Sequence, residues 1–233
     1  MNEELERIKA VYRRRMQPGF SDRDSLSRPG ELYMRQQREQ AVLRMLRRAN
    51  LAQLSDLRVL EVGCGRGKTL ANWTRWGVLQ SNVYGIDLME PSVREAAELL
   101  PHARLLVGSA GQLPFPDRSF DIVTQFTVFT SILDETMRHA VAAEIQRVLT
   151  PAGAVLWYDF RYPSPRNRDV RAIRLREVRA LFRGWTADVV TTTLLPPVAR
   201  PLARLSFAAC NLLESALPPL RSHYLVLLRR SAR

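Results

Sequence analysis

The sequence lacks the features that mark several classes of protein. Cys64 and Cys210 are its only cysteines and lie far apart, so we expect neither a disulfide framework nor a cysteine metal site. No apolar run reaches the ~18 residues of a membrane-spanning helix, and residues 1–20 contain acidic side chains without an apolar centre. Neither a spanning helix nor a secretory signal is therefore predicted, and the expected location is the cytoplasm.

Lysine and histidine are also scarce. Lys9 and Lys68 are the only lysines, so 33 of the 35 basic residues are arginines. The net charge is +12, and residues 161–233 alone carry +10. Such an excess is typical of binding to nucleic acid or anionic lipid, but a general bias of the sequence towards arginine explains it as well. The three histidines and the acidic residues do not stand at the spacing of metal ligands, so no metal site is predicted.

What the sequence does contain is an alternation of short apolar runs and helical stretches. Two helices, over 2–16 and 31–49, are predicted to form an N-terminal helical cap within residues 1–50. From residue 51 onwards the alternation predicts one α/β domain with a parallel sheet and crossover helices on both faces. The helices are expected at 68–77, 91–100, 134–149 and 169–182, and two further strands at 185–195 and 223–230.

The loop after the first predicted strand reads GCGRGKT, and three motifs compete for it. A phosphate loop ending in Gly67-Lys68-Thr69 needs a glycine at position 62, where the chain has valine. A dinucleotide fingerprint needs its third glycine at position 68 or 70, where the chain has lysine and leucine. The pattern that remains is an acid followed by alternating glycines, with Glu61 at its head.

This pattern resembles motif I of the class I S-adenosylmethionine-dependent methyltransferases. The resemblance extends over roughly residues 55–160, and includes Asp87 after the second strand, GSAGQLPFPDRSFDIV at 108–123 and TMRHAVAAEIQRVLTPAGAVLWYDF at 136–160. Within the class, the nearest likeness is to the methyltransferase domain 11 group. This resemblance implies an α/β fold with a Rossmann-like, seven-stranded, mostly parallel sheet and an antiparallel last strand. The methyltransferase domain would occupy residues 51–233.

The resemblance also implies S-adenosyl-L-methionine as cofactor and S-adenosyl-L-homocysteine as product. Glu61 suits a ligand with ammonium and sulfonium charge, and Asp87 can accept both hydroxyls of a ribose. Ser109 departs from the group, which usually has an aspartate there, and Lys68 is expected to point to solvent. The predicted cofactor residues are Glu61, Gly63, Cys64, Gly65, Gly67, Asp87, Leu88, Ser109, Ala110 and Gln125.

Residues at the ends of the fourth and fifth strands are candidates for the chemistry, because ligands of open α/β sheets bind at the carboxyl ends of strands. Asp159 is the predicted base or substrate ligand, and Gln125 is a second catalytic candidate. The predicted substrate contacts are Tyr12, Tyr33, Phe126, Phe129 and Tyr158.

Residues 196–221 form a predicted helical insertion before the last strand, with several leucines among arginines. Three interpretations stay open: a lid over an apolar substrate, an amphipathic segment on an anionic membrane, and a plain crossover helix. His223 follows it and would approach the site only if this insertion folds over the site.

The favoured function is methyl transfer to a small molecule, with a hydroxyl of a sugar, isoprenoid or other metabolite as acceptor. One alternative is an RNA or DNA methyltransferase that uses the arginine-rich ends, although the signature (D/N)-P-P-(Y/F) of many amine-methylating enzymes is absent. The other is a catalytically degenerate subunit that binds an adenosyl ligand. The expected partner is thus a small-molecule substrate, without a specific nucleic acid, and peripheral membrane contact through 196–221 is a further hypothesis. The oligomeric state is left open.

Overall fold

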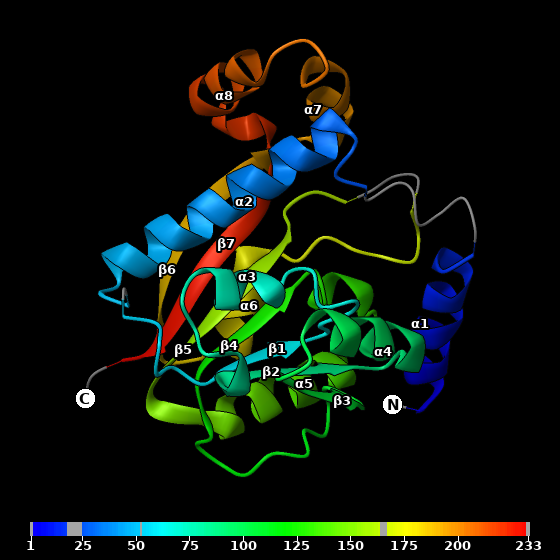
Figure 1. Ribbon diagram of the computed structural model, residues 1–233, viewed down its shortest axis with the longest axis vertical. Coiled ribbons are helices and arrows are strands. Elements are labelled where there is room, and N and C mark those ends of the chain that lie inside the picture. The colour runs from blue at the N-terminus through cyan, green and yellow to red at the C-terminus, as the bar shows by residue number, and fades with distance from the viewer. Residues whose placement is uncertain (1, 18–24, 52, 164–166, 232–233) are drawn as a thin grey trace.

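The computed structural model describes residues 2–17, 25–51, 53–163 and 167–231, and its centre is a single sheet (Figure 1). The strand order is β3-β2-β1-β4-β5-β7-β6, and β7 is antiparallel to both of its neighbours while the other strands run parallel. This confirms the predicted sheet with an antiparallel last strand. The strands are β1 (Val59–Val62), β2 (Val83–Asp87), β3 (Arg104–Val107), β4 (Phe120–Phe126), β5 (Leu149–Phe160), β6 (Trp185–Leu194) and β7 (Arg221–Arg230).

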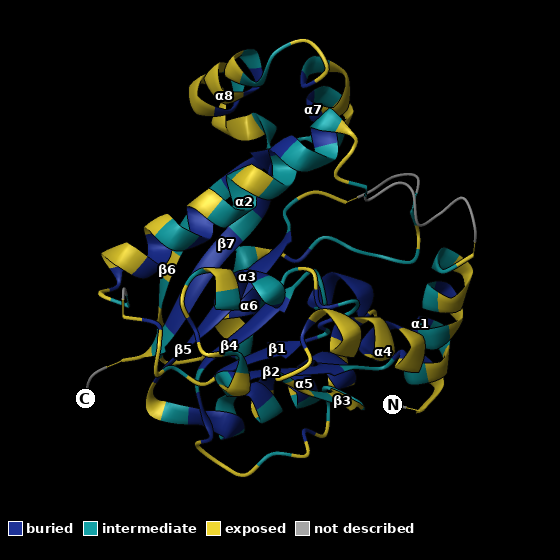
Figure 2. Cartoon of the chain, viewed as in Figure 1, coloured by how far each residue is buried: buried dark blue, intermediate teal, exposed yellow. Residues whose placement is uncertain are grey.

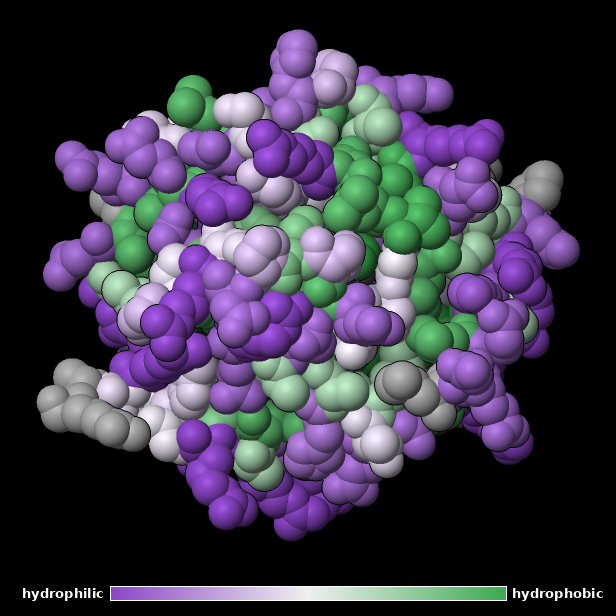
Figure 3. Space-filling view, turned by 90° about the horizontal axis from the view of Figure 1, so that it is seen from below, coloured by the Kyte–Doolittle hydropathy of each residue, from purple (hydrophilic) through white to green (hydrophobic). Residues whose placement is uncertain are grey.

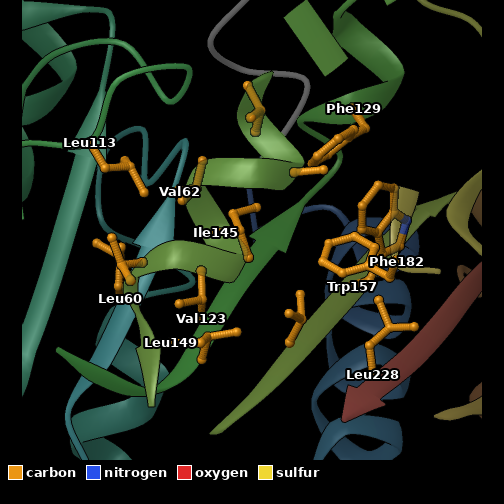
Figure 4. Packing of buried hydrophobic residues seen from close by; sticks show 14 of the residues in the cluster. Leu60, Val62, Leu113, Val123, Phe129, Ile145, Leu149, Trp157, Phe182 and Leu228 are labelled. Atoms are coloured by element: carbon orange, nitrogen blue, oxygen red, sulfur yellow. The ribbon is translucent and has the colours of Figure 1, made fainter. Parts of the chain in front are cut away.

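Helices cover both faces of the sheet, because its central strands are apolar on both sides. On one face, α2 and α3 pack against side chains such as Ile122 and Leu156. On the other, α5 and α6 pack against side chains such as Val123 and Trp157 (Figure 4). The helices are α1 (Asn2–Arg15), α2 (Pro29–Arg48), α3 (Ala71–Arg75), α4 (Glu90–Leu99), α5 (Glu135–Val148), α6 (Leu175–Leu181), α7 (Pro196–Leu202) and α8 (Phe207–Ala216), and the 3₁₀ turns are η2 (Gln80–Asn82), η3 (Phe129–Ser131) and η4 (Pro218–Leu220).

Two predicted helices are shorter than expected. The helix predicted over 68–77 is reduced to α3, since the turns of the glycine loop continue to residue 70. The helix predicted over 169–182 begins only at Leu175. Before it, the backbone N–H groups of Arg171 and Ile173 donate to the carbonyls of Thr130 and Phe160, which holds this segment against the ends of η3 and β5.

The two N-terminal helices lie on different parts of the molecule (Figure 1). Glu4 of α1 accepts hydrogen bonds from the backbone of Leu133 and Asp134, which lead into α5. α2 crosses the face of β6 and β7, and its Met45 and Leu46 share a hydrophobic cluster with the sheet. α2 is therefore part of the core that supports the sheet.

The insertion at 196–221 consists of α7, α8 and η4, and it joins two strands that are antiparallel neighbours. The interpretation as a plain crossover helix is therefore wrong, because a crossover joins parallel strands. The insertion projects from the end of this strand pair and packs against α2 instead.

The strands at the centre of the sheet are buried (Figure 2). Figure 3 views the molecule from below the orientation of Figure 1, where hydrophilic side chains cover most of the face and hydrophobic ones gather towards one side. None of the helices in the described part of the chain combines the length and the hydropathy needed to span a bilayer.

Candidate active site

A cavity of about 680 Å³ opens at the carboxyl ends of the parallel strands, and both N-terminal helices, α1 and α2, contribute to its wall. This is where open α/β sheets bind their ligands. Its walls come from the glycine loop and the end of β2 on one side, and from β4, β5, β7 and α2 on the other. A second hollow of the same volume lies between α2, β6 and α8, but the glycine loop does not contribute to it.

The glycine loop forms the floor of the first half of the cavity. Gly63, Gly65 and Gly67 have φ angles of 69°, 51° and 72°, which favour glycine. A Cβ on Gly63 would lie 2.5 Å from Val128 Cγ2, and one on Gly67 would lie 2.9 Å from Ala96 Cβ. A Cβ on Gly65 would meet nothing within 4 Å, so at this position the backbone is open to a ligand.

Glu61, at the end of β1, is buried and lines the cavity. Its Oε2 has no hydrogen-bond partner. Burial raises the pKa of Glu61 to about 8, the Arg38 guanidinium opposes this shift, and the Asp87 carboxylate adds to it. A buried carboxyl with an unpaired oxygen is costly, and a cationic group in the cavity would supply the missing partner.

Asp87 ends β2 and organises the loop around it. Its Oδ2 accepts the N–H of Gly65 at 2.9 Å, and its Oδ1 accepts the N–H of Met89 at 2.9 Å. Burial raises the pKa of this carboxyl, and the backbone N–H bonds oppose the shift. These backbone bonds, with a further one from Leu88, leave acceptor capacity on the carboxylate for a hydroxyl of a ligand.

The second half of the cavity is aromatic, and Arg38 of α2 packs against its rings. Phe126, Tyr158 and Phe160 line it from β4 and β5, and the Arg38 guanidinium lies 5.3 Å and 5.6 Å from the ring centres of Phe126 and Tyr158. Arg38 also donates to the Thr69 hydroxyl at 3.4 Å. This side chain, on α2, therefore contacts both halves of the cavity.

His223, at the start of β7, lies in the same wall, stacked on Tyr158 at 4.4 Å between ring centres. The Ser222 hydroxyl donates to the carbonyl of Thr193 at 2.8 Å, and its oxygen lies 2.8 Å from His223 Nδ1. Because the carbonyl uses the only hydroxyl proton, Nδ1 must carry the hydrogen of the ring. Nε2 is then a free acceptor. Burial, and to a smaller extent the Arg38 cation, lower the pKa of His223 to about 3, so the ring is neutral at pH 7.

Most of the predicted cofactor residues form the first half of the cavity. The structure places Glu61, Gly63, Cys64, Gly65, Asp87, Leu88 and Ala110 in the wall, with the predicted substrate contacts Tyr12, Phe126 and Tyr158. Gly67 packs behind the loop against α4. Ser109 does not line the cavity, because its hydroxyl accepts the N–H of Gly111 at 3.2 Å within its own turn.

The predicted catalytic residues Gln125 and Asp159 do not reach the cavity. Both are buried on the face of the sheet opposite α2, and Gln125 Nε2 donates to Asp159 Oδ2 at 3.3 Å. The strand pleat explains the difference, since adjacent residues point to opposite faces and Phe126 and Tyr158 are the ones that face α2.

Two predicted substrate contacts also lie elsewhere. Phe129 is fully buried against Trp157, with ring centres 4.1 Å apart, in the core around α5 and α6 (Figure 4). Tyr33 packs edge-on against Phe207 of the insertion and donates to Glu214 at 2.9 Å. Both are held in apolar clusters, and neither side chain lines the cavity.

The sequence prediction missed several wall residues, of which Arg38, Thr193 and His223 are the most informative. No local motif marks them, because they come from α2, β6 and β7 and meet only in the fold. Lys68, expected in solvent, is exposed and also borders the cavity. In the described ranges, no group of three or more His, Cys, Asp or Glu side chains could hold a metal ion.

The strand order, the glycine loop and the acids at the ends of β1 and β2 define a class I S-adenosylmethionine-dependent methyltransferase fold. Residues 60–157 match the family model described as a methyltransferase domain, Methyltransf_11. The fold is similar to that of a putative sarcosine dimethylglycine methyltransferase from Galdieria sulphuraria, with a TM-score of 0.61 and 16% identity over 83% of this chain and 85% of that one.

Two curated relatives are similar in sequence over part of their length. Phthiotriol/phenolphthiotriol dimycocerosates methyltransferase 1 of Mycobacterium ulcerans is 33% identical over 49% of this chain and 42% of its own. tRNA N(3)-cytidine methyltransferase METTL2 of Gallus gallus is 32% identical over 56% of this chain and 36% of its own. The chain thus spans less than half of the length of these relatives.

Proposed function

We propose that the cavity binds S-adenosylmethionine and that the protein transfers its methyl group to a hydroxyl of a small molecule. The observation that carries this proposal is the buried Glu61 carboxyl, whose Oε2 is unpaired at the wall of the cavity. A ligand that brings positive charge would favour loss of the proton from this carboxyl and would pair with it, whereas a phosphate would find no counter-charge there. This separates an adenosyl sulfonium ligand from the nucleotides that other glycine loops bind.

The residues of the first half of the cavity fit the parts of this cofactor. Glu61 would hold the amino acid end, Asp87 the ribose hydroxyls, and Leu88 and Ala110 would border the adenine. Gly65 leaves room for the ligand directly against the backbone. Bound there, S-adenosylmethionine would supply a methyl group on a cationic sulfonium, which departs as a neutral thioether.

The second half of the cavity would hold the acceptor. Phe126, Tyr158 and Phe160 provide an apolar wall for a ring or a hydrocarbon, and basic side chains at the cavity, such as Arg38 and Arg200, disfavour a cationic acceptor. Placing the acceptor oxygen in line with the methyl group accounts for much of the acceleration in such a reaction. His223 Nε2 accepts a hydrogen bond from the acceptor's hydroxyl and orients its oxygen, and Ser222 holds the ring in the required tautomer. The hydroxyl proton passes to solvent as the oxygen gains the methyl group.

The names of the relatives bear on the acceptor. The mycobacterial relative is named for a triol and the chicken relative for a cytidine of tRNA. The neutral histidine and the aromatic wall favour a hydroxyl-bearing small molecule of the first kind. A nucleic acid acceptor would depend on phosphate contacts, and its binding would weaken steeply with salt.

Calorimetry with S-adenosylhomocysteine tests the cofactor half, with Asp87→Ala as the variant that should lose binding. Turnover of labelled methyl donor with hydroxyl, amine and thiol acceptors tests the other half. We expect methylation of hydroxyls, and a loss of kcat of about 100-fold in His223→Gln with little change in the KM for the donor. His139→Gln, at an exposed histidine of α5, is the matched control. If the wild-type protein did not bind S-adenosylhomocysteine, the proposal would be overturned. If it methylated RNA and none of the small molecules, the acceptor would be a nucleic acid instead of a small-molecule hydroxyl.

A further inference from the structure

The insertion formed by α7 and α8 lies at one end of the molecule (Figures 1 and 2), and several of its leucines are exposed. Leu205 is 85% exposed, Leu212 is 72% exposed and Leu217 is 46% exposed. Ala208 and Leu212 are exposed four residues apart in α8 and so share one side of that helix, and Leu205 is exposed in the turn that precedes it. The opposite side of α8 is the one that packs, since Cys210 is buried in the cluster with Tyr33.

The charges of the insertion are arranged by sign. Its one acid, Glu214, is buried and accepts hydrogen bonds from Tyr33, Thr192 and the backbone of Thr193 and Leu194. The exposed charges of residues 196–220 are therefore all positive, and they are those of Arg200 and Arg204. Arg200 is paired with Glu31 of α2, whereas Arg204 lies next to Leu205 in an exposed position.

The exposed leucines follow shortly after residues of the cavity wall in the sequence. Pro196 and Arg200 of α7 line the cavity, and α7 leads through Arg204 and Leu205 into α8. A surface that bound these leucines would thus lie beside the half of the cavity with Phe160 and His223.

We infer that the α7–α8 insertion docks the protein on the surface of an anionic lipid bilayer, with Leu205 and Leu212 entering the interface and Arg204 facing the head groups. Apolar side chains flanked by arginines are the combination that such surfaces bind. Charge favours this occupant over a second copy of the chain, because a symmetric contact would bring the positive side chains of both copies together. The bilayer would also bring a lipid-soluble acceptor to the cavity. Docking itself does not depend on the proposed methyl transfer.

Co-sedimentation of the whole protein with vesicles tests this inference without donor or acceptor, so its failure would leave the proposed function untouched. The vesicles are phosphatidylglycerol and phosphatidylcholine in equal parts, or phosphatidylcholine alone. We expect binding to the anionic vesicles only, and its loss at about 1 M salt, where the screening length is ~3 Å. Arg204→Gln should lower the partition coefficient about fivefold.

The double variant Leu205→Ser/Leu212→Ser should lower the partition coefficient about tenfold or more. The matched control is Leu79→Ser/Leu99→Ser, which removes leucines that are 56% and 50% exposed outside the insertion and should bind like wild type. Equal binding by both double variants would overturn the inference. The inference would also be overturned if the wild type did not bind vesicles and light scattering showed it to be a dimer that the Leu205→Ser/Leu212→Ser substitutions convert to monomers.

Discussion

Gln125 and Asp159 are joined by a side-chain hydrogen bond of 3.3 Å on the side of the sheet that faces away from the cavity. Gln125 Oε1 also accepts the N–H of Val128 at 3.0 Å. The pair therefore fixes the turn after β4 to the end of β5. Phe126 and Tyr158, their neighbours in sequence, form the cavity wall on the other side.

From this position we predict that Asp159 is not the base of the reaction. Asp159→Asn should leave kcat and KM nearly unchanged in a methyl-transfer assay, because the side chain does not line the cavity. A loss of kcat of about 100-fold or more, the usual contribution of a general base, would contradict this prediction. Far-UV circular dichroism of the variant would show whether any loss reflects unfolding instead.

The sequence predicted the strands, the glycine loop and Asp87 because each of these rests on local chemistry. Alternating glycines, and an acid after an apolar run, are visible within a few residues. The second half of the site could not be found in this way. At the end of a strand that is buried on both faces, sequence alone does not tell which of two neighbours faces the cavity, as Gln125 and Phe126 illustrate. Arg38 and His223 meet only because β7 runs beside β5.

Replacement of Glu61 should change stability and binding in opposite directions. The carboxyl has a pKa of about 8 in the fold against about 4.5 in the unfolded chain. The folded state thus holds its proton more tightly, and the free energy of unfolding of the wild type falls as the pH rises from about 4.5 to 8. Glu61→Gln lacks this proton, so its stability should fall less over that range. Urea unfolding of the unliganded protein at pH 5 and pH 8 measures the difference.

The same variant should bind S-adenosylhomocysteine about 30-fold more weakly, because a neutral amide replaces the partner of the amino group. Calorimetry at pH 7 measures this. If Glu61→Gln bound S-adenosylhomocysteine as tightly as the wild type, Glu61 would not be a contact of this ligand. A decline in stability with pH as steep as that of the wild type would show that the carboxyl is not buried as the structure has it.

Gly65 and Gly67 should respond differently to alanine. Both have positive φ, so each substitution costs about 1–2 kcal/mol of backbone strain. Gly67→Ala also forces its Cβ against Ala96 on α4, which adds about 1–3 kcal/mol to the loss of stability. Gly65→Ala meets no protein atom and should be the more stable variant, yet it should weaken ligand binding because its methyl group occupies space at the cavity. Urea unfolding and calorimetry on both variants check the contrast, and equal effects on stability would refute it.

Tyr33→Phe should destabilise the attachment of the insertion to α2. The phenol donates to the buried Glu214 carboxylate at 2.9 Å, and a hydrogen bond to a charged group contributes about 1.5–3 kcal/mol. Tyr162→Phe is the control, since that hydroxyl donates to the Pro219 carbonyl at 2.9 Å in an exposed position. Denaturant unfolding should show the loss for Tyr33→Phe and a much smaller one for Tyr162→Phe. Similar losses of unfolding free energy in the two variants would indicate that the buried hydrogen bond stabilises the fold no more than the exposed one.

His223 should make the protein sensitive to acid. Burial, and to a smaller extent the Arg38 cation, lower its pKa to about 3 in the fold, whereas an unfolded histidine has a pKa of about 6.5. Its neighbours Tyr158, Phe160 and Ser222 carry no charge that would offset a protonated ring. The unfolded chain therefore takes up a proton first, and stability present above pH 6.5 is lost as the pH falls towards 3. His223→Gln removes this contribution, so its free energy of unfolding should fall less between pH 7 and pH 5 than that of the wild type. His139→Gln, at an exposed position, should retain the wild-type slope, and parallel slopes in all three proteins would mean that His223 is not buried as a neutral ring.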